Sequence, residues 1–279
     1  MRRGGAERQW LIRVAAACLI GACATPTEQA GRFARAAGLE PVVLQGEGFR
    51  HWSQYRAGQG GRRLHVYVDH DGSPWLAGQF VAADPTPRDP VALRLMARDP
   101  GPALYVGRPC HFEVDGPQRC QPLQWTHERY GERVVASMAR AVQEFAASHG
   151  FDEVVLIGHS GGGAIVMLMA PRLPQTRAVV TIAGNLDVAA WSREHGFSPL
   201  VGSLNPAAGA PLPSAITQLH YVGSEDRTIT PAMVQGYAKR DPGARVVEVP
   251  GFDHRCCWEA EWPRFLCRPP LQESTACHN

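Results

Sequence analysis

The stretch VVLIGHSGGGAIVML, residues 154–168, constrains the fold of this 279-residue chain more than any other. A run of β-branched and apolar residues leads into a serine among four glycines, and a second apolar run of helical character follows. A strand that turns directly into a helix indicates an α/β architecture with a mostly parallel sheet. The glycines themselves fit two kinds of site, a phosphate cradle or a sharp turn that presents Ser160 as a nucleophile.

The phosphate cradle needs residues that this stretch does not contain. Its Walker form has a lysine followed by serine or threonine, and GHSGGGAIVM contains no lysine. The dinucleotide pattern G-x-G-x-x-G also fails, because Gly161 and Gly163 are followed by Val166 where the third glycine should stand. The sequence therefore favours the turn over the cradle.

The turn interpretation accounts for every residue of the pentapeptide G-x-S-x-G, which spans residues 158–162. A serine on a strained turn between strand and helix needs neighbours without Cβ atoms, because the two elements crowd together there. We expect Gly158 and Gly162 to provide that room, and His159 to support the turn. The pentapeptide alone is a weak signal, so a base and an acid must be found elsewhere.

The rest of the chain alternates short β-branched runs with helical patterns, as a parallel sheet covered by helices requires. Residues 130–150 carry apolar side chains at helical spacing and predict an amphipathic helix that ends at Gly150. Residues 42–56 are expected to add antiparallel strands at the edge of the sheet, and residues 185–213 form an irregular, lid-like excursion. The predicted strands are 62–70, 103–109, 152–159, 177–184, 217–223 and 245–251.

Two polar turns follow the last two predicted strands. Strand 217–223 runs into GSEDRTITP, which carries Asp226, and strand 245–251 runs into GFDH, which carries His254. The carboxyl ends of parallel strands meet at one edge of a sheet, where sites form. We therefore expect Asp226 and His254 to lie near Ser160, as the acid and base that activate a serine hydroxyl.

Other carboxylates compete with Asp226 as the partner of the histidine. Glu225 is its neighbour, and Asp187 follows the strand that lies one earlier in the chain. Asp253 is discounted, because it adjoins the histidine in sequence and is expected to point away from it. Asp226 is preferred among these residues.

The order serine, acid, histidine is that of the α/β-hydrolases, and at these residues the chain resembles that superfamily. The resemblance covers residues 62–266 and rests on the elbow, the acid turn GSEDRTITP and the final GFDH. It implies the α/β-hydrolase fold, with a mostly parallel central sheet and helices on both faces. The segments VYVDHDGSPW and YVGRPC further resemble a bacterial lipoprotein subgroup of the same fold.

The resemblance implies a role for each residue of the set. Ser160 attacks an acyl carbonyl, His254 takes its proton and returns it to the leaving group, and Asp226 orients the imidazole. The backbone N–H of Gly161 is one expected donor to the oxyanion. A second donor is expected from the turn DHDGSPW, where the HGGG form of the motif is missing and the candidates are Asp71, Gly72 and Ser73, the first two favoured.

The function implied is that of a serine hydrolase that cleaves an ester, thioester or related acyl bond through an acyl-enzyme. The substrate class is a small or lipid-like acyl compound, and no metal or organic cofactor is expected. Three alternatives stay open: an acyltransferase on the same residues, a cofactor-free peroxidase, and an envelope scaffold that has lost its chemistry.

The first 23 residues have the pattern of a targeting segment rather than of folded structure. A basic opening and a short apolar run precede IGAC, residues 20–23, which resembles the bacterial lipobox. The apolar run is too short to span a bilayer. We expect a signal peptide over residues 1–23, a lipidated Cys23 that anchors the protein on the periplasmic side of a membrane, an N-terminal segment over 24–61 and a catalytic domain over 62–279.

Six cysteines follow the targeting segment, and an even number in an exported chain favours disulfides over free thiols. Cys110 and Cys120 bracket a polar loop and are the simplest pair. A zinc site is disfavoured, because the chain has no CxxC pairs or matched Cys and His spacings. The pairing of the remaining four stays open: Cys256, Cys257, Cys267 and Cys277.

The charge balance excludes one class of partner. Lysine and arginine total 28 and aspartate and glutamate total 26, so the formal net charge is +2. The basic residues form no stripe, and nucleic acid is therefore not an expected partner. Nothing in the sequence addresses the oligomeric state.

Overall fold

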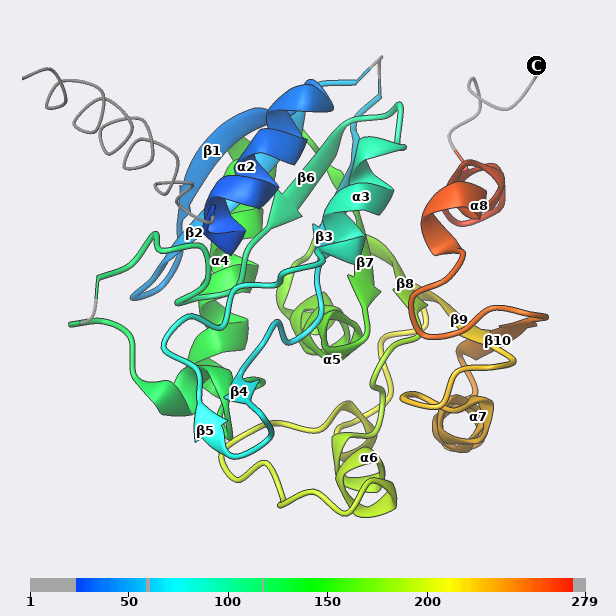
Figure 1. Ribbon diagram of the computed structural model, residues 1–279. Helices are drawn as coiled ribbons and strands as arrows, with labels where there is room; N and C mark the ends of the chain where they lie inside the picture. Colours follow the sequence, from blue (N-terminus) through cyan, green and yellow to red (C-terminus); the bar gives the residue numbers. More distant parts are fainter. Residues whose placement is uncertain (1–23, 59–60, 117, 273–279) are drawn as a thin grey trace, which may run out of the picture.

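A single eight-stranded sheet organises the chain in the computed structural model, which describes residues 24–58, 61–116 and 118–272 (Figure 1). Its strand order is β1-β2-β6-β3-β7-β8-β9-β10. The strands are β1 (Glu40–Gln45), β2 (Arg50–Arg56), β3 (Arg63–Val68), β6 (Ala103–Val106), β7 (Glu153–His159), β8 (Thr176–Ile182), β9 (Thr217–Gly223) and β10 (Ala244–Val249).

The strand directions match the sequence expectation. Neighbouring strands from β6 to β10 pair in parallel, whereas β1 pairs antiparallel with β2 and β2 pairs antiparallel with β6. The antiparallel edge expected over residues 42–56 is therefore confirmed. The segment 24–61 contributes β1 and β2 to the same sheet as the rest of the chain, so it is structurally continuous with the region that follows.

Helices cover both faces of the sheet, because the central strands are apolar on both faces. Along β7, Val154 and Leu156 face one core, whereas Val155 and Ile157 face the other. The first core is completed by α4 (Glu132–Ser148), α5 (Gly161–Met169) and α7 (Pro231–Ala238). The second is completed by α2 (Pro26–Ala36), α3 (Val91–Ala97) and α8 (Trp258–Leu266).

The helix predicted over residues 130–150 is α4. Its buried positions include Val134, Val135, Met138 and Val142, the apolar stripe read from the sequence. Beyond its C-cap, Gly150 adopts a φ of +75°, a conformation that glycine adopts without strain.

Other elements differ from the sequence expectation. Helices α2 and α3 were not predicted from the sequence. Helix α3 is buried at almost every position and so has no polar face that would produce a helical pattern. Helix α2 begins at a capping box formed by Thr25 and Glu28. The excursion 185–213 is not wholly irregular, because the Asp187 side chain accepts the N–H of Ala190 and starts a helix. The further elements are the hairpin β4 (Trp75–Leu76) and β5 (Phe80–Val81), α6 (Val188–Glu194), and the short 3-10 turns η2 (Pro122–Trp125), η3 (Ala170–Arg172) and η4 (Pro206–Ala208).

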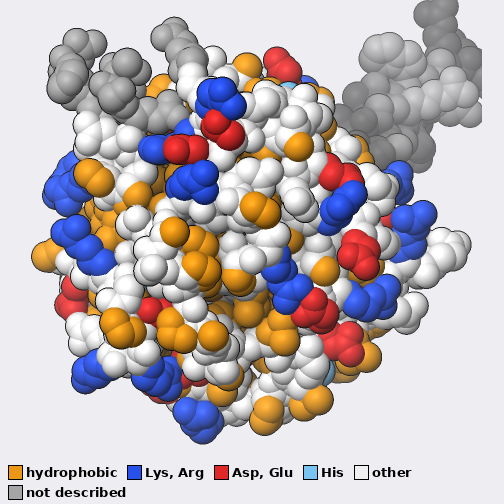
Figure 2. All heavy atoms as spheres, turned by 180° about the vertical axis from the view of Figure 1, so that it is seen from behind, with side chains coloured by type: hydrophobic (Ala, Val, Ile, Leu, Met, Phe, Trp, Pro, Cys, Tyr) orange, Lys and Arg blue, Asp and Glu red, His pale blue; other side chains and the backbone are white. Residues whose placement is uncertain are grey.

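The surface carries charges of both signs. On the face seen in Figure 2, lysine and arginine side chains alternate with aspartate and glutamate rather than gathering by sign. Within the described part of the chain, no helix combines the length and the apolar composition needed to cross a membrane.

Candidate active site

Ser160 occupies the turn between β7 and α5. Its backbone has a φ of 54° and a ψ of −119°, a region that residues with a side chain rarely adopt. The Ser160 N–H donates to the carbonyl of Ile182 on β8 at 3.0 Å, and the N–H of Asn185 donates to the Ser160 carbonyl at 2.9 Å. These bonds to β8 and to the segment that follows it hold the strained turn and leave the hydroxyl at the carboxyl edge of the sheet.

The two glycines that flank the serine have no space for a side chain. A Cβ at Gly158 would overlap the carbonyl of Gly162 and lie 2.7 Å from the nitrogen of Gly163. A Cβ at Gly162 would overlap the carbonyl of Val68 on β3 and lie 2.7 Å from the Asp69 carbonyl. The room predicted for these glycines is needed because the helix starts directly against β7 and β3.

His254 and Asp226 are brought to Ser160 by the turns after β10 and β9. His254 Nε2 lies 2.9 Å from Ser160 Oγ, and His254 Nδ1 lies 2.8 Å from Asp226 Oδ2. A carboxylate can only accept, so the Nδ1 of a neutral ring carries the proton and its Nε2 is free to accept from the serine hydroxyl. The three side chains thus form one continuous chain of hydrogen bonds.

The acid is itself fixed by its turn. Asp226 is buried, and its other oxygen, Oδ1, accepts the N–H groups of Thr228 and Ile229, each at 2.8 Å. The acid turn and the base turn are joined by a hydrogen bond from the N–H of Glu225 to the carbonyl of Phe252 at 2.9 Å. Because both partners are held by backbone groups, the imidazole has a defined orientation.

The competing carboxylates are engaged elsewhere. Asp187 caps α6 and also contacts Asn205 and Arg240, at 3.0 and 2.6 Å. Asp253 is exposed, and its Oδ1 accepts the N–H groups of Arg255 and of Cys256 within its own turn. Among the described residues, Asp226 and neither of these carboxylates hydrogen-bonds to His254 Nδ1, so the geometry singles out Asp226.

Two of the three candidate N–H groups for the second oxyanion donor already donate to other acceptors, which narrows the choice. The N–H of Gly72 donates to His70 Nδ1 at 3.0 Å, and the N–H of Ser73 donates to the Pro85 carbonyl at 2.8 Å. The expectation for Gly72 as a donor is therefore corrected. Its φ of +71° gives it a conformational role instead. The N–H of Asp71 donates to no group in the described part of the chain. Gly161 stands at the first position of α5, where an N–H has no intrahelical acceptor.

Three residues that the sequence did not single out for the site surround the Asp71 carboxylate. Arg108 Nη1 lies 2.5 Å from Oδ1, Arg129 Nη1 lies 2.9 Å from Oδ2, and the Tyr130 hydroxyl contacts both oxygens at 2.8 and 2.7 Å. The only sequence signal was the RPC segment, which contains Arg108. Nothing in residues 129–130 marked them as neighbours of a turn almost sixty positions earlier.

Two histidines support the edge of the site. His159 is buried, and its Nε2 lies 3.0 Å from the carbonyl of His254, so it ties the base turn to the elbow. His70 accepts the Gly72 N–H through Nδ1, and its Nε2 therefore donates to the Asp89 carbonyl at 3.0 Å. His159 has the supporting role expected of it.

A pocket of about 940 Å³ opens over these groups and is lined by Ser160, His254, Asp226, Asp71 and His70, among others. Among the described residues, no group of three or more His, Cys, Asp or Glu side chains is arranged to hold a metal ion.

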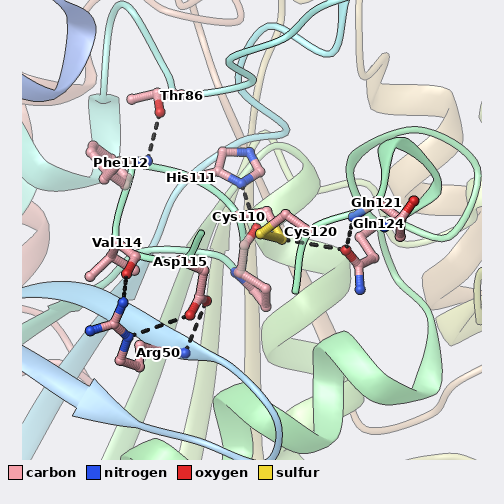
Figure 3. Close-up of a disulfide and its surroundings, with 11 residues drawn as sticks. Arg50, Thr86, Cys110, His111, Phe112, Val114, Asp115, Cys120, Gln121 and Gln124 are labelled. Atoms are coloured by element: carbon pink, nitrogen blue, oxygen red, sulfur yellow. Dashed lines mark hydrogen bonds and ion pairs between the residues drawn. A yellow bond between two sulfur atoms is a disulfide. The ribbon is translucent and has the colours of Figure 1, made fainter. Parts of the chain in front are cut away.

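Two disulfides join cysteines that both lie within the described residues. Cys110 is joined to Cys120 in the loop after β6, and Figure 3 shows Gln124 beside the bridge, its Oε1 3.4 Å from Cys110 Sγ. Cys256 is joined to its neighbour Cys257, two residues beyond the base. Cys267 is also disulfide-bonded. The expected lipidation site Cys23 and the remaining cysteine, Cys277, lie outside the described residues.

Comparisons with known proteins agree with this architecture. A family model described as alpha/beta hydrolase fold matches residues 115–214, which include the elbow. A search of curated protein sequences gives no match.

Three solved structures illustrate the fold, each at low sequence identity. An a/b serine hydrolase without lid from Xanthomonas campestris is 14% identical, covers 82% of this chain and 93% of its own, and has a TM-score of 0.52. A membrane phospholipase A, described as a bacterial virulence factor, is 17% identical over 88% and 90% of the two chains, with a TM-score of 0.55. A Pyrococcus furiosus esterase is 12% identical over 82% and 89%, with a TM-score of 0.55. The family match over residues 115–214 and the sheet topology together show that this chain has the α/β-hydrolase fold.

Proposed function

We propose that the protein is a serine hydrolase that cleaves an ester, thioester or related acyl bond through an acyl-enzyme. The observation that carries the proposal is the hydrogen-bond chain from Asp226 through His254 to Ser160, at 2.8 and 2.9 Å. A serine hydroxyl is a weak nucleophile, and a base with an orienting acid is what activates it.

The reaction follows from these contacts. Ser160 Oγ attacks the acyl carbonyl while its proton passes to His254 Nε2, and the imidazolium is stabilised by Asp226. The negative oxygen that forms is met by the N–H groups of Gly161 and Asp71. His254 then protonates the leaving group, which departs, and a water molecule repeats the sequence to release the acid and restore the serine.

The direct test is labelling by a fluorophosphonate probe together with hydrolysis of p-nitrophenyl esters of increasing chain length. The native protein should be labelled and active, and Ser160→Ala should lose both properties. Ser148→Ala, at the distant end of α4, is the matched serine control and should behave as the native protein. If the native protein takes no label and hydrolyses none of the esters, the proposal is wrong.

We also propose that the protein is exported and held on the periplasmic side of a bacterial membrane through a lipidated Cys23, as in the lipoprotein subgroup that its sequence resembles. The IGAC segment and the pairing of Cys110 with Cys120 support this location, because disulfides persist in oxidising compartments. Cys23→Ala should shift the protein from the membrane fraction to the soluble fraction. Unchanged partitioning would contradict the anchor.

A further inference from the structure

A buried group of charges lies beside the proposed oxyanion donors. Asp71, Arg108, Arg129 and Tyr130, here called the Asp71 cluster, converge on one carboxylate through the contacts described above. The guanidinium groups are also fixed by backbone carbonyls, since Arg108 Nη2 donates to the Arg129 carbonyl and Arg129 Nε donates to the Thr126 carbonyl at 2.6 Å. Each charged member is thus held on more than one side.

The cluster touches both halves of the oxyanion site. Asp71 supplies the second N–H through its backbone, and its side chain lies directly against Gly161, which supplies the first. A Cβ at Gly161 would overlap Asp71 Oδ1 and lie 2.7 Å from the Tyr130 hydroxyl. The position of the Asp71 carboxylate therefore sets the distance between the two donor N–H groups.

The cluster also carries an unbalanced charge. Two guanidinium groups face one carboxylate, and the side chains of Arg108 and Arg129 are only 4% and 6% exposed. Burial alone would raise the pKa of Asp71, but the charges of Arg129 and Arg108 outweigh it and hold that pKa well below its usual range. The adjacent His111 adds no charge at neutral pH, because burial and Arg108 lower its pKa to about 4. The cluster as a whole therefore keeps one positive charge in excess, and its carboxylate is the charged group that lies against Gly161.

We propose that the Asp71 cluster is the positioning element of the oxyanion site: it fixes the spacing of the Asp71 and Gly161 amides, and its two guanidinium groups neutralise the carboxylate that lies against Gly161, where the oxyanion develops. The inference rests on the proposed function, because an oxyanion forms only if Ser160 attacks an acyl carbonyl. The substrate carbonyl carries no full charge before attack, so the cluster acts on the transition state more than on substrate binding. Its residues thus control kcat rather than KM.

The experiment compares two buried tyrosines that each donate to an aspartate carboxylate. Tyr130→Phe removes one bond to Asp71 and leaves both arginines in place, whereas Tyr67→Phe removes the equivalent bond to Asp99, on the opposite face of the sheet. With p-nitrophenyl butyrate as substrate, Tyr130→Phe should lower kcat about tenfold, because small displacements of catalytic groups have effects of this order. Its KM should stay within about twofold of the native value, and Tyr67→Phe should keep native kcat and KM.

A transition-state analogue separates positioning from a general loss of stability. An alkylboronic acid forms a tetrahedral adduct with a nucleophilic serine, so its inhibition constant should rise in Tyr130→Phe in proportion to the loss of kcat/KM. Arg129→Lys keeps the positive charge but lacks the planar guanidinium group, and it should retain more activity than Arg129→Met. If the arginine variants do not fold, the tyrosine pair decides alone.

The outcomes distinguish this inference from the proposed function. If the native protein hydrolyses the ester, Ser160→Ala does not, and Tyr130→Phe matches Tyr67→Phe in kcat and in boronate inhibition, the inference is wrong and the proposed function stands. A rise in the KM of Tyr130→Phe without a change in kcat also overturns it. If the native protein shows neither hydrolysis nor labelling, the proposed function fails, and the catalytic role of the cluster fails with it.

Discussion

Two aspartates at opposite ends of the sheet each accept a hydrogen bond from a buried tyrosine, but they serve different purposes. Toward the amino ends of β3 and β6, Asp99 accepts from Tyr67 at 2.6 Å and lies 2.7 Å from His65. At the carboxyl edge, Asp71 accepts from Tyr130 and from two arginines. Both carboxylates have a pKa below the usual value, since these partners outweigh the effect of burial.

The difference lies in what surrounds each network. The Asp99 network is covered by α8, where Trp262 Nε1 donates to the Tyr67 hydroxyl at 3.1 Å. The Asp71 cluster instead lies under a turn whose backbone lines the pocket, within contact of the elbow. Each carboxylate joins parts of the fold that are distant along the chain, but only at the carboxyl edge do these contacts reach residues of the pocket.

The largest expected effect tests whether the carboxyl edge is catalytic rather than structural. Asp226→Asn keeps the shape of the acid but allows the wrong imidazole tautomer, and kcat should fall by about 10⁴. Asp253→Asn, whose carboxylate bonds only within its own turn, should lose less than about tenfold. Ester hydrolysis and thermal melts of both variants give the comparison, and equal losses of kcat would argue against Asp226 as the orienting acid.

The next largest effect tests the Asp99 network near the amino ends of β3 and β6. Asp99→Ala leaves His65 and Tyr67 without their buried partner, and the free energy of unfolding should fall by about 3–5 kcal/mol. The kcat of the folded fraction should stay native, because Asp99 contacts no residue of the pocket. Urea denaturation and active-site titration measure the two quantities. A loss of kcat per labelled serine would show that the two ends are coupled.

Acid pH should weaken the fold through histidines before it affects either aspartate. Burial lowers the pKa of His220 to about 4, from 6.5 for an exposed histidine. Between these values the unfolded chain binds a proton that the folded chain does not, so stability falls as pH falls, by about 3 kcal/mol in total. His220→Gln should show a shallower loss of unfolding free energy between pH 6.5 and 4 in urea titrations. An identical pH dependence in both proteins would contradict this assignment.

The smallest effect tests whether the disulfide contributes to the position of the neighbouring Asp71 cluster. Replacing Cys110 and Cys120 together by serine releases a short loop, and the unfolding free energy should fall by about 2–3 kcal/mol. Arg108 lies only two residues before this loop, yet it is held by Asp71 and by the Arg129 carbonyl. We therefore expect kcat to change less than threefold, and a larger fall would mean that the disulfide itself positions Arg108.

Much of the architecture and the three central side chains could be predicted from the sequence. The elbow around Ser160 is a local pattern, and the turns with Asp226 and His254 follow apolar strands that are recognisable by themselves. In contrast, Arg129 and Tyr130 reach Asp71 across 58 and 59 residues, and no local pattern encodes such a contact. The direction of the Gly72 N–H was also beyond the sequence, because it depends on where the His70 ring lies.

The separation of the reacting groups along the chain has a consequence for how activity is acquired. Ser160 and His254 are 94 residues apart, and His254 follows β10, the last strand of the sheet. Contacts between distant residues require long loops to close and form slowly. Local helices regain their structure long before such contacts exist, so catalysis during refolding should lag behind the recovery of helical circular dichroism. The recovery of activity should therefore follow the docking of the final strand rather than the collapse of the chain.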